Sequence, residues 1–359
     1  MLKLYHGKTE FEQWRKRLFL TDKESLKMDI TKIKKPKVLV VGDVAIDEMV
    51  YGDTERISRE APVLILRHTK TKIILGAASN AAHNISTLNG GKVSVIGTYG
   101  EDYYGPILLK AFEDAKVDTS YMVLAPERPT TVKTRISGSC SQSVTQQIVR
   151  IDRQTTDWLT EETENKVCEQ IKKAMPNFDA VILSDYHLGC LTDKVIKTTV
   201  EEAKKLGKIV VADVQKNMTR YKGVTAMTPN QPDTEKFVGF FIKDEESLKK
   251  AGETLINAAD SELMLITRGG DGMAVFEKDG HYDPIPVFNK TDVFDVTGAG
   301  DTVVASFTLG LAAGLTPKHA AIIGNLAASI VIRSFGCATT TVKELIKTAE
   351  KINFEKFRG

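Results

Sequence analysis

The sequence predicts an α/β fold, in which helices flank a doubly wound and mostly parallel sheet. Short runs of β-branched residues recur along the chain, and each has a Gly or an Asp at or next to its end. The runs are KVLVVGD (37–43), KVSVIGTYG (92–100), AVILSDY (180–186), KIVVADV (208–214) and LMLITRGG (263–270). Runs that are apolar throughout are typical of strands buried on both faces, and this burial indicates a parallel sheet.

Segments with helical periodicity alternate with these runs, notably 193–206 and 246–258. Strands that alternate with helices predict βαβ units in one doubly wound sheet. In such sheets the ligand binds beyond the carboxyl ends of the strands. The Gly and Asp residues that end the five runs are therefore expected at the functional site.

Two stretches, 50–70 and 129–153, alternate apolar and polar residues and are rich in Val, Ile and Thr. This alternation predicts antiparallel strands with one face in water. We expect them to form a small sheet that projects from the core as a lid. An apolar edge or face on such a sheet must be covered, and a symmetric second copy covers it, so we expect a homodimer through the lid.

Composition excludes several classes of protein. The 359 residues are 42% hydrophobic and 27% charged, as in an ordinary globular chain, and the net charge of +2 does not favour a nucleic-acid or membrane-surface partner. The expected partner is a small molecule. The four cysteines form no C-x-x-C pair, and no apolar run is long enough to span a membrane. We therefore expect a cytoplasmic protein.

The two ends of the chain differ from its middle. Residues 1–36 carry ten Lys or Arg against five Asp or Glu, which indicates a basic N-terminal extension. Within it, Phe11, Trp14, Leu18 and Phe19 recur at helical spacing and predict a short helix that packs on the body. One α/β domain is expected over 37–350, and a C-terminal tail over 351–359.

The most informative segment is FDVTGAGDT (294–302), which precedes an apolar helical stretch. Small glycines before a helix leave unpaired backbone N–H groups at its N-terminus, where they favour an anion. Asp301 lies in the same turn, and a carboxylate there would repel a bound phosphate. From the residues alone, Asp301 is either a general base that accepts a hydroxyl proton or a cap of the helix.

The segment DVTGAGDT resembles a signature of the ribokinase/PfkB family of carbohydrate kinases, and 97–105 (Gly-x-x-Gly-Glu-Asp-x-x-Gly) resembles the family's N-terminal signature. The resemblance extends from about Lys37 to Leu345. It implies a ribokinase-like fold and transfer of the γ-phosphoryl group of ATP to a sugar hydroxyl. It also implies that Asp301 is the catalytic base and that Gly298, Ala299 and Gly300 form the anion hole.

The resemblance also implies the remaining site residues. Those expected to bind the sugar are Asp47, Gly76, Asn80, Arg150 and Asp185. Those expected to bind the nucleotide are Asn230, Thr267, Arg268, Gly270, Gly272, Asn325 and Ala328. Asn230 and Asp233 are expected to hold Mg²⁺ through water, with Glu235 as an alternative acid, and Asp295 and Thr297 to hold a monovalent cation such as K⁺. Asp295 has the alternative of fixing its loop through backbone amides.

Within the family, the chain is similar to kinase domains that convert D-glycero-D-manno-heptose 7-phosphate to the 1,7-bisphosphate. Those domains typically have S-D-Y-x-K-G and D-P-K, whereas this chain has Leu188 and Gln215 at the two lysine positions. A phosphate needs cationic partners, so Lys216, Arg150, Arg135 or Arg220 must compensate if the substrate is phosphorylated. The alternatives are a kinase for another sugar, an unphosphorylated sugar or a nucleoside, and a sugar- or nucleotide-binding member without turnover.

Overall fold

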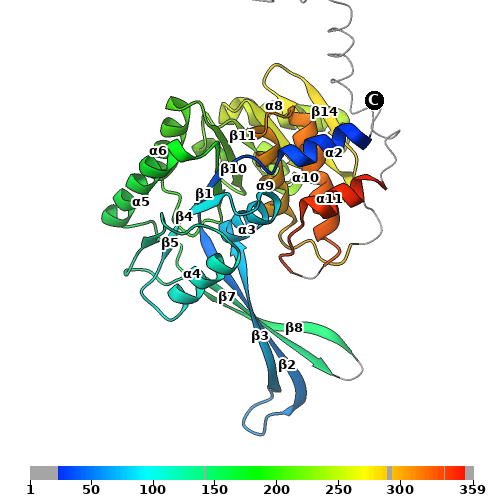
Figure 1. The fold of residues 1–359 in the computed structure, drawn as a ribbon. Helices are drawn as coiled ribbons and strands as arrows, with labels where there is room; N and C mark the ends of the chain where they lie inside the picture. The colour runs from blue at the N-terminus through cyan, green and yellow to red at the C-terminus, as the bar shows by residue number, and fades with distance from the viewer. Residues whose placement is uncertain (1–22, 141–142, 289–292, 335, 352–359) are drawn as a thin grey trace, which may run out of the picture.

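A computed structural model describes residues 23–140, 143–288, 293–334 and 336–351 (Figure 1). Its body is built on one eight-stranded sheet, in the order β14-β13-β12-β11-β10-β9-β1-β4. The strands are β1 (Val38–Gly42), β4 (Val93–Ile96), β9 (Ala180–Asp185), β10 (Ile209–Val214), β11 (Ala226–Met227), β12 (Leu263–Thr267), β13 (Met273–Glu277) and β14 (Tyr282–Ile285). All pairs from β4 to β12 are parallel, whereas β13 and β14 are antiparallel.

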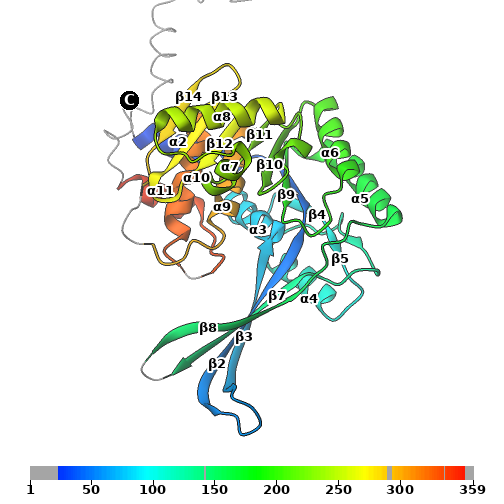
Figure 2. The ribbon, with the colours of Figure 1, turned by 180° about the vertical axis from the view of Figure 1, so that it is seen from behind.

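Helices cover both faces of this sheet (Figures 1 and 2). They are α2 (Lys23–Lys32), α3 (Ala78–Asn89), α4 (Tyr104–Asp114), α5 (Glu161–Ala174), α6 (Asp193–Lys205), α7 (Gln231–Val238), α8 (Glu245–Ala259), α9 (Ala299–Ala312), α10 (Pro317–Val331) and α11 (Val342–Ala349). Alternate residues of a strand face opposite layers: Val38 and Val40 pack with the layer of α3, α9 and α10, whereas Leu39 and Val41 pack with that of α5, α6 and α8. This two-sided core confirms the predicted fold class.

Four of the five predicted runs contain a single strand of the sheet, but the run 92–100 contains two. Its first part is β4, which pairs with β1 in the large sheet. Its second part, β5 (Thr98–Tyr99), pairs with β6 (Val123–Leu124) in a separate two-stranded sheet. The predicted helices at 193–206 and 246–258 correspond to α6 and α8. Among the described helices, none combines the length and the apolar character that crossing a bilayer requires.

A second sheet, the lid, projects from the body in both views (Figures 1 and 2). It has the order β3-β2-β7-β8, with β2 (Val44–Ile57), β3 (Leu64–Ala77), β7 (Val132–Cys140) and β8 (Ser143–Arg153). β2 follows β1 after a single residue, Asp43, and its first residues are buried while its last four are exposed. The lid is therefore anchored in the core at one end and exposed at the other.

The expectation of purely antiparallel strands in the lid is wrong for its central pair. β2 pairs with β3 and β7 with β8 in antiparallel fashion, but β2 pairs with β7 in parallel. Each hairpin leaves the body with its first strand, so the two first strands run in the same direction where they meet. The first hairpin extends closer to the body than its predicted stretch 50–70, from Val44 to Ala77, whereas the second lies within the predicted stretch 129–153, from Val132 to Arg153.

Helix α2 belongs to the packed body, although it lies within the predicted extension 1–36. Leu26, Ile30 and Ile33 are fully buried in the core cluster that includes α9, α10 and α11. Asp29 accepts a hydrogen bond from Nδ1 of His319 at 2.8 Å, which joins α2 to α10. The residues that predicted a helix near 11–19 lie outside the described residues, as does most of the predicted tail.

Truncation of Ile30 is expected to destabilise the fold. Ile30→Ala leaves a cavity between α2 and the helices beneath it, and such a cavity costs about 2–5 kcal/mol. Met28→Ala is the control, because Met28 is 62% exposed on the same helix and its loss is expected to cost no more than about 0.5 kcal/mol. Urea unfolding of the two variants measures the difference. Equal free energies of unfolding would contradict the packing of α2 on the body.

Candidate functional site

The site is built around the N-terminus of α9. Gly298 precedes the helix with φ 77°, in the left-handed region, and a Cβ there would lie 2.6 Å from Nδ2 of Asn80. Both constraints require glycine at this position. The amide of Ala299 donates to the carbonyl oxygen of Val296 at 3.2 Å. Amides of the first helical turn have no intrahelical partners, so this end of α9 is suited to bind an anion.

Asp301 lies in that first turn, is only 5% exposed, and is held from two other elements. Nδ2 of Asn80, on α3, donates to its Oδ2 at 2.7 Å, and the hydroxyl of Tyr186, just after β9, donates to its Oδ1 at 2.8 Å. Burial raises the pKa of Asp301 to about 6, although these two hydrogen bonds lower it in part. The carboxylate is therefore ionised at neutral pH and close to the range of a general base.

Asn80 is oriented by a chain of buried polar contacts between α3 and α9. Nδ2 of Asn84 donates to Oδ1 of Asn80 at 3.2 Å, and the hydroxyl of Thr302 donates to Oδ1 of Asn84 at 2.9 Å. With its oxygen accepting from Asn84, the amide of Asn80 presents its nitrogen to Asp301. The two helices thus fix both the position and the hydrogen-bonding sense of this contact.

Asp47, on β2, occupies the lid side of the site. A Cβ at Gly76, on the neighbouring strand β3, would lie 2.9 Å from the carboxyl group of Asp47, so this approach requires glycine. Arg135, on β7, donates from Nη1 to Oδ1 of Asp47, and Sγ of Cys337 lies 3.7 Å from its Oδ2. The same Sγ would lie 3.3 Å from a Cβ at Gly298, so Cys337 joins Asp47 to the N-terminus of α9. The negative charge of Asp47 raises the pKa of Asp301, after the larger effect of burial.

A second acid of the site, Asp213, is half-buried. It lies near the end of β10 and accepts a hydrogen bond from the hydroxyl of Thr228 at 3.0 Å. Burial, followed by the negative charge of Asp301, raises the pKa of Asp213 to about 7. The carboxyl ends of β9 and β10 meet at one edge of the sheet, as the sequence predicts, and they place this acid beside the base.

The loop after β9 is held by a buried carboxylate, Asp43. The amides of Tyr186 and Leu188 donate to its Oδ2 at 2.9 and 3.0 Å, and the amide of Cys190 donates to its Oδ1 at 3.0 Å. His187, between the first two, has φ 58°. Asp43 therefore fixes a strained loop and, through it, the position of Tyr186.

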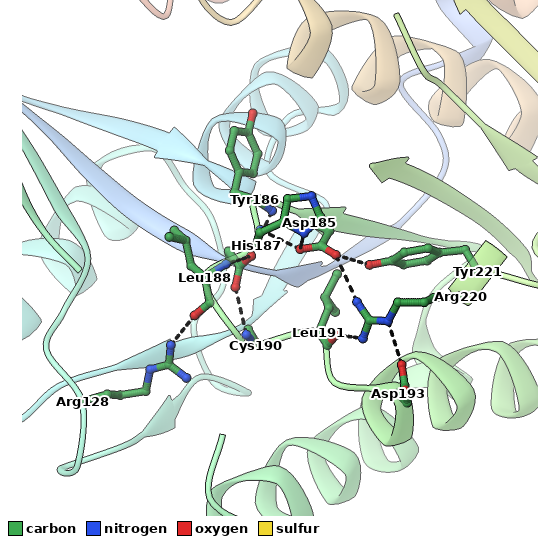
Figure 3. A network of polar contacts seen from close by, with 11 residues as sticks. Arg128, Asp185, Tyr186, His187, Leu188, Cys190, Leu191, Asp193, Arg220 and Tyr221 are labelled. Atoms are coloured by element: carbon green, nitrogen blue, oxygen red, sulfur yellow. Dashed lines mark hydrogen bonds and ion pairs between the residues drawn. The ribbon is translucent and has the colours of Figure 1, made fainter. Parts of the chain in front are cut away.

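Asp185, expected to bind the sugar, is the last residue of β9 and has other partners (Figure 3). Its Oδ1 accepts from the amide of His187 at 2.7 Å, and its Oδ2 accepts from the hydroxyl of Tyr221 and lies 3.6 Å from Nη1 of Arg220. Arg220 also bonds the carbonyl oxygen of Leu191 at 2.7 Å. The carboxylate of Asp185 is thus engaged with groups that hold the loop.

Arg150, also expected at the sugar, lies on β8, the edge strand of the lid. Its side chain is 49% exposed and pairs with Asp152 at 2.9 Å. In the strand register it lies directly opposite Arg135, which does reach Asp47. The structure therefore brings Asp47, Gly76, Asn80 and Asp301 together, and leaves Asp185 and Arg150 outside this group.

A pocket of about 240 Å³ lies on the other side of the α9 N-terminus. Its lining includes five of the expected nucleotide residues together with two of the expected anion-hole residues: Thr267, Gly270, Gly272, Asn325, Ala328, Ala299 and Gly300. Arg268 is not among the lining residues, because its Nε donates to Oε1 of Gln231 at 3.1 Å. The pocket and Asp301 thus share the N-terminus of α9.

Asn230 and Asp233 bond each other at the start of α7. The amide of Asp233 donates to Oδ1 of Asn230 at 2.8 Å, and Nδ2 of Asn230 donates to Oδ2 of Asp233 at 2.7 Å. Glu235, the alternative acid, accepts from the amide of Ile242 and from Nε2 of Gln231. Asp233 is therefore the acid of this segment that fits Mg²⁺, which keeps several waters and needs only one or two carboxylates beside substrate phosphates.

Asp295 fixes the loop before α9. Its Oδ1 accepts from the amide and the hydroxyl of Thr297 at 2.9 and 2.7 Å, and its Oδ2 accepts from the amide of Gly336 at 2.8 Å. Although burial raises the pKa of Asp295, these bonds lower it overall. The carboxylate has about four acceptor positions, so one remains for a cation.

Sequence reasoning did not assign a role to Tyr186 or Lys133. Tyr186 bonds the predicted base, and Nζ of Lys133, on β7, lies 5.4 Å from the centre of its ring. Burial, and then the nearby carboxylates of Asp301 and Asp213, raise the pKa of Tyr186 well above its usual value. The sequence feature that could have identified Tyr186 was its place at the carboxyl end of a predicted strand. Lys133 had none, because a lysine in an alternating strand is usually solvated.

Comparisons of the sequence with known proteins find a family and curated relatives. The profile of the pfkB family of carbohydrate kinases matches residues 35–344. The chain is 38% identical over 311 residues to the bifunctional protein HldE of Nitratiruptor sp. and 40% identical over 309 residues to that of Geobacter metallireducens. The alignments cover 87% and 86% of this chain, but only 64% and 62% of the relatives. The chain thus spans less than two-thirds of their length.

Solved structures with the same fold are more distant in sequence. A ribokinase from Arabidopsis thaliana, complexed with ribose and ATP, aligns with a TM-score of 0.66 at 18% identity. The phosphofructokinase-2 of Escherichia coli, in complex with potassium, aligns with a TM-score of 0.70 at 17% identity. Each alignment covers 88% of this chain and 99% of the other chain. At these identities the likeness concerns the fold.

The raised pKa of Asp301 predicts a pH-dependent effect on stability. A carboxyl whose pKa is about 6 when folded stabilises the fold fully below its unfolded value near 4, and this contribution is lost as pH rises through 6. Asp301→Asn removes that dependence. Its free energy of unfolding relative to wild type is therefore expected to rise by roughly 3 kcal/mol from pH 4 to pH 8.

Urea unfolding at several pH values measures this difference, and any loss of hydrogen bonding in the variant enters as a constant offset. Asp271→Asn is the control, because the side chain of Asp271 is 73% exposed and its variant is expected to follow wild type at every pH. A difference between Asp301→Asn and wild type that does not change with pH would contradict the raised pKa.

Proposed function

The chain belongs to the pfkB family of carbohydrate kinases, and from that premise we propose that it phosphorylates a sugar hydroxyl with ATP. The leading acceptor is D-glycero-D-manno-heptose 7-phosphate, which would give the 1,7-bisphosphate. A different or unphosphorylated sugar is the alternative. The observation that carries the proposal is the position of Asp301, a buried carboxylate between a sugar-side acid, Asp47, and the pocket behind Ala299 and Gly300.

Asp301 is the general base of the proposed reaction. The acceptor hydroxyl gives its proton to Asp301 while its oxygen forms a bond to the γ-phosphorus and the bond from that phosphorus to the β-phosphate oxygen breaks, which releases ADP. Gly298, Ala299 and Gly300 stabilise negative charge on the transferred oxygens through backbone amides and the helix N-terminus. A pKa of about 6 leaves the base ionised at neutral pH.

The sugar lies against Asp47, Gly76 and Asn80 in this proposal. Asp47 accepts hydrogen bonds from sugar hydroxyls, Gly76 allows the backbone to approach, and Asn80 orients Asp301. Their burial favours a dry site in which such polar contacts are strong. We assign Asp185 to the loop, since Tyr221, Arg220 and His187 engage its carboxylate.

The nucleotide occupies the pocket lined by Thr267, Gly270, Gly272, Asn325 and Ala328, with Arg268 at its border. Asn230 and Asp233 hold Mg²⁺ through water, and the ion, when bound, neutralises charge on the β- and γ-phosphates. Asp295 and Thr297 contribute oxygens to a monovalent cation such as K⁺ beside the anion hole.

In this proposal, Arg135 is the cation that binds the 7-phosphate and neutralises its charge. Of the four compensating candidates, Lys216 is exposed after β10, Arg220 is engaged with Asp185 and Asp193, and Arg150 pairs with Asp152 on the edge strand. Arg135 contacts Asp47, a predicted sugar ligand, and its side chain is only 18% exposed. Its planar guanidinium suits a phosphate that lies beside the sugar hydroxyls.

A panel of acceptors tests the function. With ATP and Mg²⁺, we expect kcat/KM for heptose 7-phosphate to exceed that for neutral heptoses, hexoses and pentoses at least tenfold, and Asp301→Asn to lower kcat by about 10²–10⁴-fold. Arg135→Gln is expected to abolish the preference. A tenfold preference for neutral sugars would favour an unphosphorylated sugar as the substrate. Absence of ATP consumption with every acceptor would contradict the proposed kinase activity.

We also propose a homodimer formed through the lid, in the reducing cytoplasm where ATP is available and the free thiols of Cys168, Cys190 and Cys337 are stable. A hollow of about 340 Å³ on the lid is lined by apolar side chains of all four strands. Large apolar residues on the lid are exposed, among them Ile57 (58%), Val63 (55%), Ile148 (47%) and Val149 (44%). A second copy would remove this apolar surface from water.

Ile148→Glu is expected to convert the dimer to a monomer, because a charge would be buried in an apolar interface. The control is Phe241→Glu, which changes a 72% exposed apolar residue on the body and is expected to leave the dimer intact. Light scattering at micromolar concentration measures both masses. A wild-type chain that is already monomeric, or an Ile148→Glu variant that remains dimeric, would sink the proposed interface.

A further inference from the structure

Tyr186 links three parts of the molecule that are distant in sequence. Its backbone amide is held by Asp43, its hydroxyl donates to Asp301 at 2.8 Å, and its ring lies 5.4 Å from the ammonium nitrogen of Lys133. Asp43 belongs to the body, Asp301 is the proposed base and Lys133 lies on the lid strand β7. The same side chain therefore contacts both the base and the lid.

We propose that Tyr186 is a positioning residue for the general base and that Lys133 couples the position of the lid to that base through the ring of Tyr186. This inference rests on the proposed function of Asp301. It adds that the lid affects the chemical step through the orientation of the base, as well as by covering the sugar.

The hydroxyl of Tyr186 orients the carboxylate without occupying it fully. Asn80 and Tyr186 each donate one hydrogen bond, to different oxygens of Asp301. A carboxylate has about four acceptor positions, so each oxygen retains one for the acceptor hydroxyl. Because burial and nearby carboxylates raise the pKa of Tyr186 well above its usual value, its phenol remains protonated and donates across the working pH range.

Lys133 is placed to transmit the position of the lid. It is the second residue of β7, and in the strand register it lies opposite Asp47 on β2 and Asp152 on β8. A cation over an aromatic ring is attracted by the negative face of the ring. A displacement of β7 would therefore weaken the contact with Tyr186 and release the hydroxyl from its fixed direction.

Charged and titratable groups reach Asp301 from several elements. Asp47 on β2 raises its pKa and Lys133 on β7 lowers it, after the larger effects of burial and of the bonds from Asn80 and Tyr186. Asp213 on β10 and Cys337 are affected by the charge of Asp301 in turn. Loss of the Tyr186 hydroxyl or of the Lys133 charge removes a group that favours the ionised base, so both changes shift its titration in the same direction.

The pH profile of kcat in Tyr186→Phe tests the positioning role. Because the variant loses a donor to the ionised base, the acidic limb is expected to move up by roughly one pH unit, and kcat on the plateau to fall about tenfold. Tyr104→Phe is the matched control: the Tyr104 hydroxyl donates to Glu48 at 3.2 Å and Arg153 lies 5.5 Å from its ring, without contact to Asp301. A Tyr186→Phe profile that superimposes on the control would overturn the inference.

Lys133 variants test the coupling to the lid. Lys133→Met is expected to shift the acidic limb upward and lower kcat, Lys133→Arg to restore both, and Lys70→Met to change neither, since Lys70 contacts Tyr51 on the lid at 5.0 Å. In the Tyr186→Phe background, Lys133→Met is expected to change kcat less than in wild type. Equal factors in the two backgrounds would show that Lys133 acts independently of Tyr186 and would refute the coupling.

These outcomes are separable from a failure of the proposed function. If wild type phosphorylates no acceptor, the kinase assignment fails and no profile exists to compare. If wild type is active and Asp301→Asn is not, the function stands, and the Tyr186 and Lys133 profiles decide the inference alone. Equilibrium binding of ADP to each variant, expected to be unchanged, identifies any variant that has lost its fold.

Discussion

The buried carboxylate of Asp301 is the constraint on which the arrangement of the site depends. A carboxylate that is 5% exposed is unfavourable unless other groups donate hydrogen bonds to it. Its donors come from α3 and from the loop after β9, which are 221 and 115 residues away from Asp301 in the sequence. Asp301 therefore requires three parts of the body to meet at the N-terminus of α9.

Each donor depends in turn on further contacts. Asn80 presents its nitrogen because Asn84 occupies its oxygen, and the close approach of Asn80 leaves no room for a side chain at Gly298. Tyr186 reaches Asp301 because the buried carboxylate of Asp43 collects the amides around His187. Substitutions at Asn84 or Asp43 are therefore expected to change the orientation of Asp301, although neither residue contacts it directly.

The acids of the site differ in what balances their charge. Asp47 has the guanidinium of Arg135, whereas Asp213 has a neutral hydroxyl donor, Thr228, and its pKa rises to about 7. Asp301 has two neutral donors and Lys133 nearby, and its pKa is about 6. Such an ordering allows one carboxylate to remain ionised near neutral pH while its neighbour is partly protonated.

The sequence by itself determined what depends on local chemistry. Buried strands appear as continuous apolar runs because both of their faces are covered, and the GAG segment before an apolar helix indicates an anion site because helix geometry exposes amides there. Asp301 could be named from its place in that turn as either a base or a cap, whereas its assignment as the base and the choice of Asp47 and Asn80 came from the resemblance to a known family. Even the alternating strands of the lid were visible, since their period follows from the pleat of a strand.

Only the tertiary structure decided which of these local features meet. The parallel pairing of β2 with β7 follows from two hairpins leaving the body side by side, which no local pattern encodes. Asp185 and Tyr186 are adjacent in sequence, yet Asp185 is engaged with Tyr221 and Arg220, whereas Tyr186 contacts Asp301. Successive side chains at a strand end point in different directions, so the partner of each is set by distant elements and not by its neighbours.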